Sequence, residues 1–96
     1  MLTGRVRFGE FEADLASGEL RRAGVPVPIQ DLPFRLLAAL LERPGAALSK
    51  AQLEERIYRW GDEVESNAVE VHIHNLRKKL GSETIRTLRG VGYALS

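Results

Sequence analysis

The sequence predicts an α+β domain in which a small antiparallel sheet precedes three helices and a final β-hairpin. Residues 5–29 hold short alternating strands joined by tight turns, residues 31–80 hold three segments of helical periodicity, and residues 85–95 hold two short strands around a glycine-rich turn. Two helices, a third helix and a terminal hairpin, in that order, make a winged helix-turn-helix. Residues 1–96 are expected to form this one domain.

The amino-terminal segment is expected to form a four-stranded antiparallel sheet. Apolar and polar residues alternate on both sides of Gly9-Glu10, and Ala23-Gly24 is typical of a hairpin turn. Pro26 and Pro28 confine the last strand to a sheet edge, because proline donates no backbone hydrogen bond. The acidic residues of this segment suggest no chemistry and are interpreted as a solvated face.

Two helices should follow the sheet. The first is expected from about Asp31 to Glu42, with Pro33 tolerated because it falls in the first turn. Ala47-Leu48 predicts a short strand, and Ser49 predicts the cap of a second helix from Lys50 to about Tyr58. The expected core residues of these helices are Phe34, Leu37, Leu40, Leu41, Leu53 and Ile57.

The stretch that organises the chain is Ser66 to Leu80, SNAVEVHIHNLRKKL. Its apolar residues recur at the spacing of a helix with one buried face; they are Val69, Ile73, Leu76 and Leu80. Asn67 with Glu70 predicts a capping box at its start, and Gly81 follows where a helix usually stops.

The opposite face of this helix carries hydrogen-bond donors and one small apolar side chain. It consists of Asn67, Val71, His74, Asn75 and Lys78, with Arg77 and Lys79 on its flanks. Glu70 falls off its edge, so the face has no carboxylate. Such a mixture suits the edges of bases in a DNA major groove, which an α-helix can enter. A solvated polar face without function is the alternative.

A second alternative makes VEVHIHN a strand, with His72 and His74 on one side as metal ligands. A helix would hold the two imidazoles about 200° apart, where they cannot share a metal. The helical stripe extends beyond the alternation, which favours the helix. An enzyme is not indicated either, because the sequence has no recognisable nucleophile, phosphate loop or carboxylate pair.

The carboxyl-terminal hairpin is expected to pair Ile85–Leu88 with Tyr93–Leu95 around Arg89-Gly90-Val91-Gly92. An arginine at its tip could enter a narrow minor groove, where the negative potential favours it. The hydroxyls of Thr87 and Tyr93 could donate to phosphates.

Composition limits the function classes only loosely. The chain has no cysteine, which excludes disulfides and thiolate zinc sites, and no apolar run of about 20 residues that could span a membrane. Its net charge is +1, but residues 66–96 hold five Lys/Arg against two Asp/Glu, whereas residues 1–65 hold nine against eleven. The positive field therefore lies where the candidate recognition helix lies.

One further feature is a tryptophan beside acidic residues, in the loop Arg59 to Glu65. Trp60 could bind a partner, since tryptophan favours interfaces. It could equally pack over the two preceding helices.

The motif HIHNLRKKLG followed by IRTLRGVGY resembles the effector domain of the OmpR/PhoB family of two-component response regulators. The resemblance covers nearly the whole chain, including the amino-terminal sheet. The stretch YRWGDEVESNAVEVHIHNLRKKLG is most similar to the PmrA/QseB/TctD-like branch. The resemblance implies a cytoplasmic, nucleoid-associated bacterial transcription regulator that binds promoter DNA as two head-to-tail copies on direct repeats.

It also implies roles for single residues. Those matching base-facing positions are Asn67, Val71, His74, Asn75 and Lys78. Those matching backbone or wing positions are Trp60, His72, Arg77, Lys79, Thr87, Arg89 and Tyr93, with packing equally plausible for His72. The loop with Trp60, Asp62, Glu63 and Glu65 matches the segment that contacts the sigma or alpha subunit of RNA polymerase.

The chain departs from the family pattern at the first helix, where Gln30 and Pro33 replace the usual threonine cap and its glutamate. No part of it resembles the receiver domain, so we expect an effector domain whose receiver, and the cognate histidine kinase that acts on it, lie outside these residues. No cofactor, metal or membrane contact is implied. A winged helix that binds only proteins is the alternative function.

Overall fold

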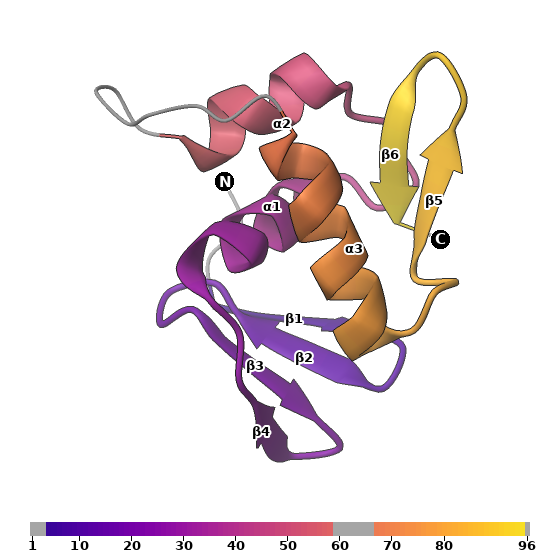
Figure 1. Cartoon of the computed structure of the whole chain (residues 1–96). Helices are drawn as coiled ribbons and strands as arrows, with labels where there is room; N and C mark the ends of the chain where they lie inside the picture. Colours follow the sequence, from indigo (N-terminus) through magenta and orange to yellow (C-terminus); the bar gives the residue numbers. More distant parts are fainter. Residues whose placement is uncertain (1–3, 59–66, 96) are drawn as a thin grey trace.

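The computed structural model describes residues 4–58 and 67–95 (Figure 1). Four strands come first: β1 (Arg5–Phe8), β2 (Phe11–Asp14), β3 (Glu19–Arg22) and β4 (Val25–Val27). Three helices and a hairpin follow: α1 (Asp31–Glu42), α2 (Lys50–Ile57), α3 (Ala68–Leu80), β5 (Ile85–Leu88) and β6 (Gly92–Leu95). The predicted fold class, an α+β winged helix-turn-helix with an amino-terminal four-stranded sheet, is confirmed.

The amino-terminal sheet is an antiparallel meander in the order β1-β2-β3-β4. As predicted, the proline-containing strand β4 is an edge, and the turn before it contains Ala23 at φ 49° and Gly24 at φ 83°. Phe11, Ala13 and Leu20 are buried on the inner face. The outer face carries partly exposed ion pairs, among them Arg5–Glu12, Arg7–Glu12 and Arg21–Glu19. Such pairs near the surface contribute little to stability.

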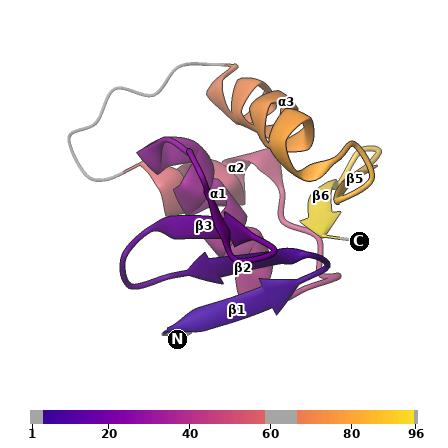
Figure 2. The ribbon, with the colours of Figure 1, turned by 90° about the horizontal axis from the view of Figure 1, so that it is seen from below.

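The three helices lie on one side of the sheet, and the hairpin β5–β6 stands beside α3 (Figures 1 and 2). Helix α1 packs against α2, α3 and β6, and its apolar stripe is almost fully buried. The buried stripe predicted for α3 is confirmed at Val69, Ile73, Leu76 and Leu80. No helix in the described ranges is long and apolar enough to cross a bilayer.

The helix caps differ in part from the prediction. Ser49 caps α2 as expected and forms a full capping box: the Gln52 N–H donates to Ser49 Oγ at 3.1 Å, and the Ser49 N–H donates to Gln52 Oε1 at 2.9 Å. The box predicted for Asn67 and Glu70 is wrong. Asn67 precedes α3 at φ −114° and ψ 14°, not in the extended conformation of an N-cap, and its side chain makes no capping bond.

The segment between α1 and α2 also differs. Ala47-Leu48 was expected to be a strand, but only Leu48 pairs, in a single bridge to Tyr93. The Leu48 N–H donates to the Tyr93 carbonyl at 2.8 Å, and the Tyr93 N–H donates to the Leu48 carbonyl at 2.9 Å. Pairing stops there because Ser49, the next residue, is the cap of α2. The bridge ties the start of α2 to β6.

Glu42 at the end of α1 forms an ion pair with Arg56 of α2. The hydrogen bond from Arg56 lowers the pKa of the Glu42 carboxyl below its ordinary value of 4.5. A lowered folded-state pKa stabilises the fold above the unfolded pKa, and this stabilisation is lost as the pH falls through the folded pKa.

We therefore expect Glu42→Gln to lower stability modestly, by less than about 1 kcal/mol at pH 7, because the pair is partly exposed. The difference from the wild type should shrink toward zero as the pH falls below about 4. Urea unfolding at pH 7, 4.5 and 3 measures both. Glu55→Gln, a change to an exposed glutamate of α2 beside Arg56, is the control. A difference that stayed constant with pH would contradict the assignment.

Candidate nucleic-acid interface

The face of α3 opposite its buried stripe is largely open. Asn67, Val71, His74 and Lys78 are exposed there, and Asn75 is half-buried at one margin. Val71 is 45% exposed and lies among these polar residues. An exposed branched apolar side chain among donors is what a thymine methyl beside polar base edges would require.

The charge of this surface is one-sided. Glu70, at the edge of the face, forms an ion pair with Lys50 of α2 at 3.3 Å. The last turn of α3 carries Arg77, Lys78 and Lys79, where cations also interact favourably with the helix dipole. The exposed face of α3 is therefore positive along its carboxyl-terminal half, which suits a polyanion.

The hairpin β5–β6 forms a wing beside α3, and its tip is the exposed turn Arg89-Gly90-Val91. A surface groove of about 390 Å³ lies between the wing and the start of α2. It is lined by Lys50, Thr87, Arg89, Tyr93 and the turn residues between them. The predicted position of Arg89 at the tip is confirmed, and Thr87 is also exposed. The wing thus presents a cation and a hydroxyl next to the open face of α3.

Arg77 lies between the helix and the wing. Its Nε and Nη2 atoms donate to the Ile85 carbonyl at 3.2 and 2.8 Å, and Nη2 also donates to Thr87 Oγ1 at 2.8 Å. Sequence reasoning placed Arg77 and Thr87 as separate phosphate contacts and did not anticipate that they bind each other. Because the Thr87 oxygen accepts this bond, its own O–H remains able to donate to a phosphate.

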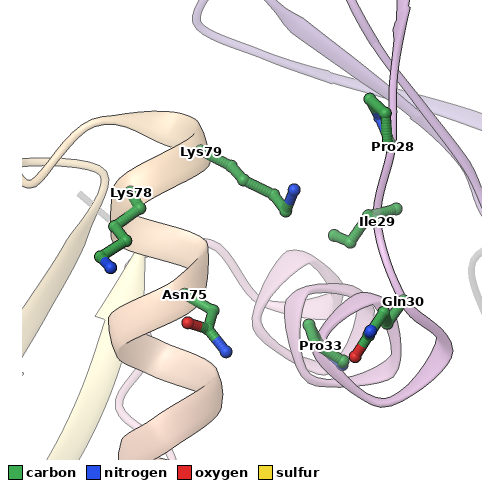
Figure 3. Close-up of a pocket in the computed structure, with 7 residues that line it drawn as sticks. All are labelled: Pro28, Ile29, Gln30, Pro33, Asn75, Lys78 and Lys79. Carbon is green, nitrogen blue, oxygen red and sulfur yellow. The ribbon is translucent and has the colours of Figure 1, made fainter.

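A cleft of about 510 Å³ separates the carboxyl-terminal half of α3 from the segment that leads into α1 (Figure 3). Asn75, Lys78 and Lys79 line one wall, and Pro28, Ile29, Gln30 and Pro33 line the other. Lys79 extends across the cleft toward Pro28 and Ile29, and the Asn75 amide points toward Pro33 and Gln30 (Figure 3). Asn75 therefore belongs both to the margin of the open face and to this cleft.

The strand interpretation of VEVHIHN is wrong, because residues 68–80 form a helix. His74 is exposed and His72 is half-buried, on different sides of α3. Within the described part of the chain, no group of three or more His, Cys, Asp or Glu side chains could hold a metal ion. The predictions for Trp60, Asp62, Glu63 and Glu65 lie outside the described residues.

Comparison with known proteins agrees with this geometry. Residues 24–95 match the family model described as transcriptional regulatory protein, C terminal. The chain belongs to this family. It is 46% identical over 87 residues to the response regulator protein PmrA of Pseudomonas aeruginosa, covering 91% of this chain and 39% of PmrA. It is 43% identical over 90 residues to the transcriptional regulatory protein QseB of Escherichia coli O157:H7, covering 94% and 41%.

The fold of this chain also matches that of solved structures. The DNA binding domain of CpxR from E. coli superposes with a TM-score of 0.83 at 25% identity, covering 97% of this chain and 96% of that one. The predicted resemblance to OmpR/PhoB-family effector domains is thus confirmed. The chain spans about two fifths of the length of the curated relatives named above.

Sequence reasoning missed two parts of the candidate interface. The wall formed by Pro28, Ile29 and Gln30 is far from α3 in sequence, and no local pattern links the two. The sequence pattern indicates for Lys50 only that it begins a helix. Its position facing Glu70 and the wing follows from how α2 packs against α3, so the pattern of α2 alone could not predict it.

Proposed function

We propose that this domain binds double-stranded DNA sequence-specifically, as the effector part of a bacterial transcription regulator. The observation that carries the proposal is the open face of α3, which presents donors and one valine without a carboxylate, directly beside a wing tipped by Arg89. Family membership and the similarity to the DNA binding domain of CpxR support it.

In the proposed complex, α3 lies in the major groove, which is wide enough for one helix. Asn75 reads an adenine through its amide, Val71 contacts a thymine methyl, and the other members of the open face contact neighbouring base edges. These other members are Asn67, His74 and Lys78.

The backbone contacts are proposed to lie on both sides of α3. Arg89 reaches the minor groove or its phosphates, the hydroxyls of Thr87 and Tyr93 donate to phosphates, and Lys79 supplies a further cation. His72 is half-buried, so both packing and a phosphate contact fit its position. Trp60 is proposed as a backbone contact from its sequence position alone.

The wider context is proposed from the family resemblance. Two copies bind direct repeats head to tail, and the acidic loop with Asp62, Glu63 and Glu65 contacts the sigma or alpha subunit of RNA polymerase. A receiver domain and its cognate histidine kinase control the regulator, which acts in the cytoplasm at the nucleoid. The domain itself binds DNA and catalyses no reaction.

Random-oligonucleotide selection on the purified domain tests the proposal, followed by fluorescence anisotropy titrations of enriched duplexes at several salt concentrations. We expect enrichment of two half-sites in direct repeat, about one helical turn apart. No enrichment, with only weak and salt-sensitive binding, would instead favour a protein-interaction module or a domain that needs its receiver for specific binding.

Arg89→Ala should weaken binding by similar factors on the enriched duplex and on a scrambled duplex. Removing one phosphate contact should also lower the slope of log K against log salt concentration by about 1. Anisotropy titrations between about 50 and 200 mM salt give both quantities. Arg7→Ala is the matched control, because this exposed arginine pairs with Glu12 on the outer face of the amino-terminal sheet. An unchanged slope in Arg89→Ala would contradict the contact.

A further inference from the structure

We infer that Arg77 is a positioning residue that fixes the wing relative to α3, so that groove contacts by the helix and backbone contacts by the wing are made together. The DNA part of this inference rests on the proposed function. The inference concerns the intramolecular bonds of Arg77 and is separate from any phosphate contact that the same side chain makes.

The hydrogen-bond pattern of the hairpin explains why Arg77 is needed. In an antiparallel pair, residues alternate between positions whose backbone groups bond to the partner strand and positions whose groups point away from it. Tyr93 directs its N–H and carbonyl to Leu48, so its pairing with Thr87 is of the second kind. Two residues along the register, Ile85 opposite Leu95 must also point its backbone carbonyl away from β6.

The outward carbonyl of Ile85 lies on the outer edge of β5, where no further strand pairs among residues 4–58 and 67–95. Arg77 supplies two N–H groups to this oxygen and one to the Thr87 hydroxyl. The Leu48 bridge therefore holds the β6 edge of the wing, and Arg77 holds the β5 edge from the side of α3. A planar guanidinium suits this role because its donors form a rigid fork.

The bond from Arg77 to Thr87 restrains the wing beyond its base, on the side of the exposed tip. The wing is already attached at its base, where Ile85, Ala94 and Leu95 are buried and Thr84 Oγ1 donates to the Leu80 carbonyl at 2.8 Å. Thr87 lies further toward the exposed tip, so its bond to Arg77 restrains the part of the wing that carries Arg89. Losing the bond should let the tip move away from α3.

A double-mutant cycle between Arg77 and Arg89 separates positioning from an independent phosphate contact. The probe is a fluorescein-labelled duplex carrying the most enriched selected site, with a scrambled duplex of equal composition beside it. If Arg77 positions the wing, Arg89→Ala should cost about tenfold in affinity in the wild type and less than about threefold in the Arg77→Ala background. Two independent phosphate contacts would instead give additive losses, and additivity would overturn the inference.

The salt dependence gives a second reading of the same variants. If the two arginines contact phosphates independently, adding Arg89→Ala to Arg77→Ala should lower the slope of log K against log salt by about a further 0.9, whereas if Arg77 positions the wing the second substitution should leave the slope nearly unchanged. Arg77→Lys should recover only part of the affinity, because an ammonium cannot reproduce the fork. Arg86→Ala, which removes an exposed arginine on the same strand, should combine additively with Arg89→Ala.

A measurement without DNA keeps this inference separate from the proposed function. Amide hydrogen exchange of the free domain should be about tenfold faster at residues 87–93 in Arg77→Ala, and unchanged in Arg86→Ala. If Arg77→Ala does not fold, Thr87→Val removes only the hydroxyl acceptor and should give a smaller acceleration at the same amides. Unaltered wing exchange in the folded variants would overturn the inference, whereas a wild type without sequence preference would overturn only the proposed function.

Discussion

Gly92→Ala is expected to destabilise the domain more than any other small substitution in the wing. A Cβ at this position would lie 2.0 Å from the Leu48 carbonyl oxygen, 2.7 Å from its carbon and 2.8 Å from Ser49 Cα. These are backbone atoms of the bridging residue Leu48 and of the α2 cap Ser49, so the clash cannot be relieved by moving a flexible side chain. The φ of Gly92 is also 154°, a backbone conformation that L-residues with a side chain rarely adopt.

We expect Gly92→Ala to lower the free energy of unfolding by about 3 kcal/mol, from backbone strain, overpacking and weakening of the two Leu48–Tyr93 hydrogen bonds. For a domain of this size the melting temperature should fall by roughly 12–24 °C. Thermal and urea unfolding followed by circular dichroism measure both.

Gly90→Ala is the matched control for this prediction. Gly90 also has a positive φ, 76°, but no atom lies within 4 Å of where its Cβ would be. Its substitution should therefore cost only the conformational strain, about 1 kcal/mol. Equal losses in the two variants would show that the close approach of Leu48 is unimportant and that φ alone decides.

Most of the fold could be predicted from the sequence, because its signals are local. The α3 stripe of Val69, Ile73, Leu76 and Leu80 follows from helical periodicity, and all four are buried. The approximate bounds expected for α1 are confirmed, because an apolar stripe lies between Pro33 in the first turn and a Pro-Gly stop. The sequence also predicts that α1 lacks the usual side-chain cap, because Gln30 stands in place of threonine. In the structure the Gln30 side chain makes no capping bond.

What failed was decided by tertiary geometry. Asn67 is a residue type that favours the N-cap, but its backbone angles are not those of a cap. The path of the chain into α3 sets those angles. Leu48 forms one bridge because a helix cap follows immediately. In the candidate interface, the exposure of Val71 and His74 follows from the helical periodicity of residues 66–80. The bonds of Arg77 to the wing depend instead on how the wing packs beside α3. No spacing in the sequence encodes that arrangement.

Asn75→Ala is expected to have the largest effect on sequence specificity. A carboxamide can donate and accept at once, which matches the paired donor and acceptor that adenine presents in the major groove. Its loss should cost about 1–3 kcal/mol on the enriched duplex and much less on duplexes changed at the contacted base pair. Anisotropy titrations against duplexes substituted at each position of the half-site measure the pattern.

The position of Asn75 beside the cleft offers a second explanation for a loss of affinity in Asn75→Ala. A substitution on the opposite wall of the cleft tests it. Its amide points across the cleft toward Gln30 and Pro33, so its loss could act by disturbing the cleft instead of a base contact (Figure 3). Gln30→Ala removes the amide on the opposite wall without touching α3 and should leave base preference intact. Matching losses in the two variants, or an equal loss for Asn75→Ala on every duplex, would refute base reading. A loss confined to one base pair in Asn75→Ala alone would assign that base to Asn75, because a disturbed cleft has no means of distinguishing one base pair from another.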